Sequence, residues 1–345
     1  MPPTITSAHV NVFKRADGRA FLPSEIINEI PASLPAFQGF DERGISCPVA
    51  TKDIDGEDYE ALFKIKQNEA LVFRNFNSGV SAIDDGYERR KYGIKTAGGF
   101  VHMDHALLKR GDAGVTAWEV AKQDALQRTL LTLEKQFFYG KPKLTGDNNL
   151  AKGFPGLQSF VHPAMTLDAE GTGPELASAY LVYFHQNFGV SWIQGKGGKM
   201  SFQDEKIDLV SEPGKPERKF PALSTWFEFY PGLACHGTYT VFRIANIDVS
   251  TALEVKDKNR DAFTDEMVGT AIAMWPMNRP NVMFTTRKAA IMLGASRNAS
   301  MISASDQSKI FISAGQTMSA KSCDGDTIPV CVTDGLADNE KQWTA

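Results

Sequence analysis

The chain has 345 residues, of which 42% are hydrophobic, enough for one large domain or two modest ones with a sizeable core. Its 37 lysines and arginines stand against 41 aspartates and glutamates, so the net charge is -4. Sequence-specific nucleic-acid binding normally needs a basic excess, and this composition argues against it. The four cysteines show no C-x-x-C pattern, which argues against a cysteine metal or redox site. No stretch approaches the roughly 20 apolar residues of a membrane span, so we expect no membrane partner.

Prolines interrupt the first part of the chain, from residue 1 to about residue 56. They are Pro2, Pro3, Pro23, Pro31, Pro35 and Pro48, and they leave room only for a short helix over Ser24–Ile30. Such a segment cannot form a core of its own. We therefore expect an extended arm that lies over the rest of the subunit or over a neighbour.

The next part of the chain predicts a helix followed by a long hairpin. The helix is expected near Asp58–Ala70, and strand-like pieces follow over Leu71–Asp104. The polar run from Asp84 to Lys91 interrupts these pieces, so we place the tip of the hairpin there. A charged run of this kind is usually a solvated turn.

A long helix is predicted from Ala117 to Tyr139, because its start, its apolar stripe and its end agree. The start has a capping-box pattern at Thr116–Glu119, and Gly140 supplies the end. Apolar residues follow at steps of four, three and four, and the stripe consists of Leu126, Leu130, Leu133 and Phe137. We expect this stripe to be buried along the whole helix.

The remaining chain predicts strands and then two helices. One antiparallel sheet is expected from the strands Tyr180–Phe184, Val190–Ile193, Leu223–Phe229 and Thr238–Ile247. Helices are expected over Arg260–Met274 and over Thr286–Leu293, the second ended by Gly294. A short buried strand, Asn281–Phe284, separates the helices, and a strand over Ile328–Val332 comes near the end of the chain.

Three local patterns could carry chemistry, and each has a plainer structural interpretation. His102, Asp104 and His105 are possible metal ligands, but they lack the H-E-x-x-H arrangement, and His105 would point away from the other two on a strand. Cys235-His236 would be a nucleophile beside a base, yet neighbouring residues on a strand face opposite ways. The glycine-rich run 195–199 lacks the spacing of a phosphate-binding loop. We expect a hydrogen-bonded loop, a packed strand and a flexible turn, respectively.

The order of these elements resembles the major capsid proteins of tailed bacteriophages with the Hong Kong 97-like fold. As in podovirus-type members, the long helix ends in the acidic and aromatic stretch Glu134–Gly140, and Phe154–Leu157 follows. The likeness continues through paired strands, a helix, a short strand and a helix, in the segments 178–182, 226–233, 242–248 and 267–293, and it ends with 326–330. It covers residues 60 to 345.

The resemblance implies an α+β fold with an N-terminal arm, an extended hairpin loop, a long spine helix, a peripheral domain and an axial domain. The corresponding divisions of the chain are 1–56 for the arm, 57–106 for a helix and the hairpin, 107–249 for the spine helix and peripheral strands, 250–315 for the axial domain, and 316–345 for a terminal strand that returns to the peripheral domain.

The resemblance also implies a structural subunit that catalyses nothing and uses no cofactor or metal. Such a subunit forms hexamers and pentamers of itself in an icosahedral shell around double-stranded DNA, which it contacts without sequence specificity. Scaffolding, portal and decoration proteins are the other expected partners, and the location is the virion capsid, assembled in the host cytoplasm. The hairpin-tip residues expected to contact other subunits are Asp84, Asp85, Tyr87, Glu88, Arg89, Arg90, Lys91 and Tyr92.

Two alternatives stay open on the sequence. One is a shell protein of an encapsulin-type nanocompartment, which would have the same fold and would enclose a cargo enzyme. The other comes from a different class, a metal-dependent enzyme that uses His102, Asp104 and His105.

Overall fold

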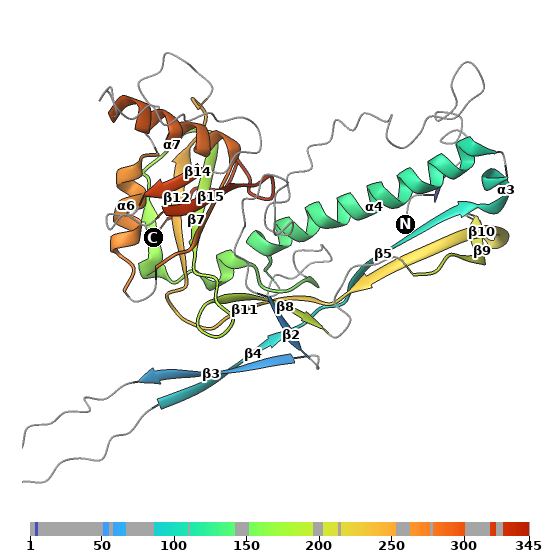
Figure 1. The fold of residues 1–345 in the computed structure, drawn as a ribbon, viewed down its shortest axis with the longest axis horizontal. Helices are drawn as coiled ribbons and strands as arrows, with labels where there is room; N and C mark the ends of the chain where they lie inside the picture. The colour runs from blue at the N-terminus through green and yellow to red at the C-terminus, as the bar shows by residue number, and fades with distance from the viewer. Residues whose placement is uncertain are drawn as a thin grey trace, which may run out of the picture.

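The computed structural model describes twelve segments of the chain: 4–5, 51–54, 58–66, 86–109, 111–141, 152–195, 203–212, 215–252, 263–276, 279–300, 318–321 and 327–344. Helices and strands are mixed in it, which confirms the expected α+β class. A six-stranded sheet with two helices forms one part, a long helix beside a four-stranded sheet forms a second, and a two-stranded hairpin projects away from both (Figure 1).

The six-stranded sheet contains parallel and antiparallel pairs in the order β14-β15-β13-β7-β12-β6. Its strands are β6 (Thr166–Asp168), β7 (Leu176–Val182), β12 (Val241–Asp248), β13 (Val282–Thr285), β14 (Met318–Lys321) and β15 (Thr327–Val332). The buried strand expected between the two helices and the strand expected near the end of the chain are thus confirmed as β13 and β15. However, β7, which we placed with the spine helix in 107–249, pairs not only with β12 from the same division but also with β13 from later in the chain.

Strand β7 is buried along its whole length because both faces of the sheet are covered. On one face Ala179 and Leu181 belong to a core with α6 (Asp265–Ala273) and α7 (Arg287–Ser300). On the other face Tyr180 and Val182 belong to a second core with the end of the long helix. Helix α7 runs through Gly294, so our expected end there is wrong; glycine lowers helix stability but does not stop a helix that packs well.

The long helix α4 spans Asp112–Tyr139, about 42 Å at 1.5 Å per residue. It ends at Gly140 as predicted, but it begins five residues before Ala117. Thr116 therefore lies inside the helix, and its hydroxyl donates to the carbonyl of Asp112 at 3.0 Å instead of forming a capping box. A hydroxyl one turn into a helix can bond to the preceding turn in this way.

Helix α4 is buried at its two ends rather than along its whole stripe. Near its start Ala117 and Trp118 pack with Val101 and Leu223, and near its end Leu133 and Phe137 are buried against the six-stranded sheet. The stripe residues between these ends, Leu126 and Leu130, are only half-buried. The prediction of burial along the full length is therefore wrong, because the two sheets contact different ends of the helix.

The four-stranded sheet has the order β1-β5-β10-β9 and lies along the first half of α4. Its strands are β1 (Thr4–Ile5), β5 (Ala97–Asp104), β9 (Lys206–Glu212) and β10 (Lys215–Phe229), and the short helix α3 (His105–Leu108) follows β5. A three-stranded sheet has the order β11-β8-β2, with β2 (Thr51–Ile54), β8 (Val190–Gly195) and β11 (Pro231–Cys235). The strands expected in one antiparallel sheet thus lie in three sheets.

The N-terminal arm is described only at β1 and β2. Each of these strands pairs with a strand of the same subunit, β1 with β5 and β2 with β8. At these two points the arm lies over its own subunit, as one of the two expected arrangements requires. The helix expected over Ser24–Ile30 lies outside the described residues.

The projecting hairpin consists of β3 (Asp58–Lys66) and β4 (Gly86–Gly93), paired antiparallel from Asp58↔Gly93 to Lys66↔Gly86. The helix expected over Asp58–Ala70 is wrong over 58–66, where apolar residues alternate at Tyr59, Phe63 and Ile65, which suits a strand. Residues 67–70 lie outside the described residues. The expected tip is also misplaced, since its residues from Gly86 to Lys91 lie within β4. Asp84 and Asp85 lie outside the described residues.

The motif Phe154–Leu157 returns the chain against the end of α4 through two glycines. The amide of Gly156 donates to the carbonyl of Gly140 at 2.9 Å. A Cβ on Gly156 would lie 2.5 Å from the amide nitrogen of Gly140, a distance that atoms cannot adopt. Glycine is therefore required here by the close approach of two backbones.

Changing Phe137 to alanine should destabilise the subunit strongly. This ring is fully buried where α4 meets the six-stranded sheet, so its loss removes apolar burial and leaves a cavity, at a cost of about 3–5 kcal/mol. Urea unfolding of the unassembled subunit measures the change. The half-buried Leu130→Ala variant is the control and should lose much less; equal losses would show that α4 is not anchored at its end.

Candidate assembly site

Aromatic rings fix the hairpin to the body of the subunit. Tyr92 of β4 is buried, and its hydroxyl donates to the carbonyl of Cys235 in β11. Around it lie Tyr59, stacked at a ring-centroid distance of 6.4 Å, and Phe160 at 6.0 Å. We expected Tyr92 to contact another subunit, but it packs inside its own subunit. We call this cluster the root of the hairpin.

The Cys235-His236 pair belongs to this root and has the packing role expected of it. The thiol of Cys235 contacts Thr240 Oγ1 at 2.9 Å, and burial raises the pKa of this thiol. Burial, with the nearby charge of Lys52, lowers the pKa of His236 to about 4. A neutral thiol that hydrogen-bonds elsewhere is not an activated nucleophile.

Beyond the root the hairpin carries charges on exposed side chains. Glu60 of β3 pairs with Lys91 of β4 at 2.8 Å and with Arg89 at 3.4 Å. The hydrogen bond from Lys91 lowers the pKa of the Glu60 carboxyl. Such exposed pairs contribute little to folding, so the charges remain available for contacts outside the subunit.

The structure places most of the residues predicted at the hairpin tip along β4 instead. The strand contains Tyr87, Glu88, Arg89, Arg90, Lys91 and Tyr92. Arg89 and Lys91 are exposed, whereas Arg90 is half-buried and lines a small pocket beside Phe160.

The possible metal ligands His102, Asp104 and His105 have separate environments. His102 is buried in β5 beside Phe100, with ring centroids 5.4 Å apart. Asp104 caps α3 by accepting from the amide of Ala106 at 2.9 Å, and His105 begins that helix. In the part of the chain that the structure describes, no three His, Cys, Asp or Glu side chains are arranged to hold a metal ion.

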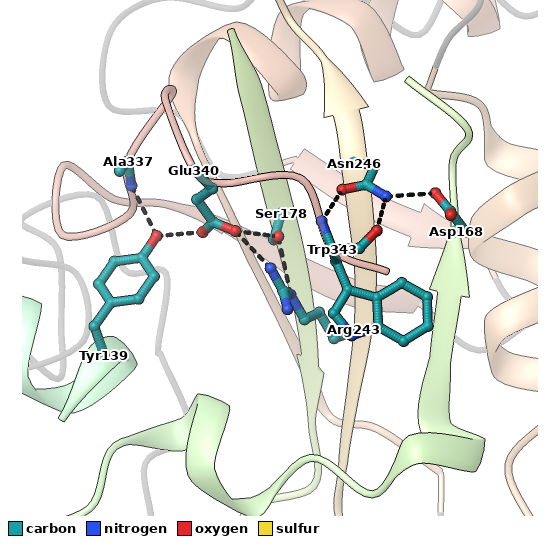
Figure 2. Close-up of polar contacts among 8 residues, drawn as sticks. All are labelled: Tyr139, Asp168, Ser178, Arg243, Asn246, Ala337, Glu340 and Trp343. Atoms are coloured by element: carbon teal, nitrogen blue, oxygen red, sulfur yellow. Dashed lines mark hydrogen bonds and ion pairs between the residues drawn. The ribbon is translucent and has the colours of Figure 1, made fainter. Parts of the chain in front are cut away.

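The C-terminal tail, residues 333–344, is tied to α4 and to the six-stranded sheet through one carboxylate (Figure 2). Glu340 accepts from Arg243 of β12 at 2.7 Å and from Ser178 of β7 at 2.6 Å. It also accepts from the hydroxyl of Tyr139 in the last turn of α4. The side chains of Arg243 and Glu340 are only 7% and 8% exposed, so the ion pair is buried.

Asn246 of β12 forms a second contact with the tail, near the C-terminal end of the tail (Figure 2). Its side chain accepts from the amide of Trp343 at 2.7 Å and donates to the carbonyl of the same residue at 2.9 Å. It also donates to Asp168 at 2.8 Å. Its backbone has a φ of 57°, a left-handed conformation that asparagine tolerates better than most residues.

We expected neither the contacts of Glu340 nor those of Asn246 with the tail. The sequence contains one hint of them, because Arg243 and Asn246 interrupt the apolar run 241–247 of β12. A buried cation needs a partner, but the partner lies 97 residues further along the chain.

A second buried carboxylate, Glu134, lies where α4 meets the start of the tail. The hydroxyl of Thr333 donates to its Oε1, while its Oε2 is buried without a hydrogen-bond partner among the described atoms. Burial, with the charge of Asp334, raises the pKa of Glu134 to about 7. Proton binding is thus coupled to the packing of the tail on α4.

Comparison with known families identifies one that covers most of the chain. Residues 67–344 match the model of the family Major capsid protein GP7. No curated protein sequence matches the chain. Of the helices that the structure describes, none combines the length and apolar character needed to cross a membrane.

Comparison with solved structures shows the same fold in a bacteriophage particle. The structure of bacteriophage Epsilon15 has 14% sequence identity and a TM-score of 0.65, and the match covers 99% of this chain and 98% of that one. The capsid of Myoviridae phage XM1 has 9% identity and a TM-score of 0.45 over 67% of this chain and 98% of that one. The encapsulin complex of Synechococcus elongatus PCC 7942 has 10% identity and a TM-score of 0.40 over 65% and 94%. The last two scores are too low to support an argument.

Replacing Glu340 with alanine should lower the free energy of unfolding by about 3–5 kcal/mol, because the change leaves the charge of Arg243 buried without its partner. Chemical denaturation of the unassembled subunit measures it. Glu60→Ala removes a carboxylate from exposed ion pairs and serves as the control, with a much smaller expected loss. A Glu340→Ala loss no larger than the control would contradict the buried-pair account.

The Glu134→Gln variant should change how stability depends on pH. A carboxyl whose folded pKa lies above its unfolded value stabilises the fold fully below about pH 4.5, and this contribution disappears as the pH rises through about 7. Glutamine stays neutral, so the variant should gain on the wild type between these values, by roughly 1–3 kcal/mol at pH 8. Unfolding at a series of pH values tests this; parallel curves for the two proteins would refute the raised pKa.

Proposed function

The chain belongs to the Major capsid protein GP7 family, the shell proteins of tailed bacteriophages with the Hong Kong 97-like fold, and we propose that it assembles as hexamers and pentamers around double-stranded DNA. As a member of this family it is a capsid shell subunit located in the virion capsid. We further propose that scaffolding, portal and decoration proteins are its partners, that it assembles in the host cytoplasm, and that it has no catalytic role.

The projecting hairpin is the observation that supports this proposal most directly. Within the described residues β3 and β4 form a sheet of only two strands, fixed to the body by its root. An isolated two-stranded hairpin is marginally stable in water, and both of its edges leave backbone groups without partners. Contacts with neighbouring subunits would supply the missing partners. We therefore propose that the exposed residues of β4, above all Arg89 and Lys91, make inter-subunit contacts.

The sheet topology supports domain divisions different from those expected on the sequence. We propose that the peripheral domain contains α4 with β5, β9 and β10, and that the axial domain contains the six-stranded sheet with α6 and α7. β7 and β12 then belong to the axial domain, because they pair with each other and β7 pairs with β13. The terminal strand β15 joins the same sheet beside β13.

Shortening the hairpin tests the proposal. Residues 62–89 are replaced by Asn-Gly, which keeps the root and the pair Glu60–Lys91 and supplies a tight two-residue turn. We expect a folded subunit by circular dichroism, because the removed part lies beyond the root. We also expect it to stay small by sedimentation under conditions in which the wild type forms shells. Normal particles from the shortened chain would show that the hairpin is not an assembly element, and an unfolded chain would place it in the core.

A further inference from the structure

Strand β9 forms an edge of the four-stranded sheet, far from the β3–β4 hairpin (Figure 1). In the part of the chain that the structure describes, β9 pairs only with β10. Its apolar side chains Ile207 and Leu209 are 58% and 69% exposed. An exposed edge strand with apolar side chains is a template for pairing with another chain, and soluble proteins usually avoid it. The edge of β9 is therefore a candidate surface for a partner.

Every second residue of β9 directs its backbone groups away from β10. The carbonyl of Lys206 faces β10, because the hydroxyl of Ser224 donates to it at 3.2 Å. Directions alternate along an antiparallel strand, so the N–H and C=O groups of Ile207 and Leu209 point to the open edge. Pro221 lies opposite Leu209 and agrees with this assignment, because proline has no N–H to donate to Leu209.

The sequence of β9 is complementary to itself in one antiparallel register. A strand that pairs with its own copy about Leu209 brings Lys206 opposite Glu212 of the copy, at both ends of the contact. A centre at Asp208 places this carboxylate opposite its own copy, and a centre at Val210 places Asp208 opposite Glu212. Like charges directly opposite are destabilising. Centres nearer the ends of β9 pair fewer residues, so charge complementarity selects the register about Leu209.

The same register also satisfies the open edge of the strand. Leu209 exchanges hydrogen bonds with its copy, and Ile207 does so with Ser211 of the copy, about six bonds in all. The Leu209 side chains then meet at the centre of the contact. They lie on the face of the sheet where Leu223, opposite Ile207, packs with α4. The two four-stranded sheets become one continuous sheet.

The start of β9 is fixed to α4, which presents the edge in a defined position. Glu205, the residue before the strand, accepts from the indole of Trp118 at 2.7 Å and from Lys122 at 3.0 Å. At the other end Glu212 has only exposed ion pairs, with Lys215 at 3.4 Å and Arg218 at 4.0 Å. Such pairs are weak, so the Glu212 carboxylate can exchange them for a contact with a second copy.

We propose that β9 pairs antiparallel with β9 of a second copy of this chain, across a two-fold axis at Leu209. A contact between identical surfaces of two copies has this symmetry. The inference rests on the proposed shell function, which supplies the neighbouring copies. It assigns an interface to the four-stranded sheet that does not involve the hairpin. A strand of a different protein would not require β9 to be complementary to itself.

Cysteine cross-linking of assembled particles tests the register. Leu209→Cys places two thiols opposite each other, at the Cα separation of roughly 4.4–6.8 Å that a disulfide needs. We expect covalent dimers on oxidation with copper phenanthroline, above the background that the native cysteines give in wild-type particles. The matched control Ile207→Cys is exposed on the same face of the same strand, but it lies about 14 Å from its own copy. It should form at least tenfold fewer dimers, and equal cross-linking of the two variants overturns the register.

Charge reversal at the two ends of β9 tests the same contact. In the Leu209→Cys chain, Lys206→Glu and Glu212→Lys each place like charges opposite each other and should reduce the cross-link at least tenfold. The double variant Lys206→Glu, Glu212→Lys reverses both charges and should restore it. Circular dichroism verifies that each variant is folded. Single variants that cross-link fully, or a double variant that does not recover, overturn the inference.

The measurement also separates this inference from the proposed function. Shells without the Leu209→Cys dimer overturn the inference and leave the shell function intact. Failure of the wild type to form shells counts against the proposed function instead. The same oxidation of concentrated, unassembled subunits then decides the inference: dimers of Leu209→Cys but not of Ile207→Cys support it, and their absence overturns it.

Discussion

The buried ion pair between Arg243 and Glu340 is the contact on which the geometry of the subunit depends. Two charges removed from water stabilise a fold only when other hydrogen bonds satisfy them. Here Ser178 and Tyr139 also donate to the carboxylate, so a single side chain joins two strands, the end of α4 and the tail. Without this carboxylate, Arg243 would be left inside the sheet with a charge and no counter-charge.

This contact holds the end of α4 and the tail on the six-stranded sheet. The end of α4 is held between the six-stranded sheet and the tail, and the start of the helix carries the four-stranded sheet. The hairpin is fixed separately, through Tyr92 and its aromatic neighbours, to the strand that follows β10. The hairpin and α4 are therefore both held on the body of the subunit. A closed shell needs this, because small errors in the angle between copies accumulate around the shell.

The sequence predicted the features that depend on a local pattern of residues. It failed for the features that depend on contacts between segments far apart in the chain. The end of α4 at Gly140 and the buried strand β13 follow from nearby residues, and the order of elements was sufficient to identify the family. The helix expected at 58–70 failed because the alternation of apolar residues there is short, and pairing with β4, about 30 residues away, stabilises a strand. At the site, the exposed charges of the hairpin were predicted. The burial of Tyr92 and the contact between Arg243 and Glu340 were not, because they require the folded arrangement of several elements.

A cryo-electron microscopy map of particles assembled from the pure chain tests the central claim most directly. The account predicts closed shells in which each β3–β4 hairpin lies on a neighbouring copy while Glu340 remains bound to Arg243 of its own chain. Shells in which the hairpin folds back on its own α4, or in which the tail exchanges into another subunit, would contradict it.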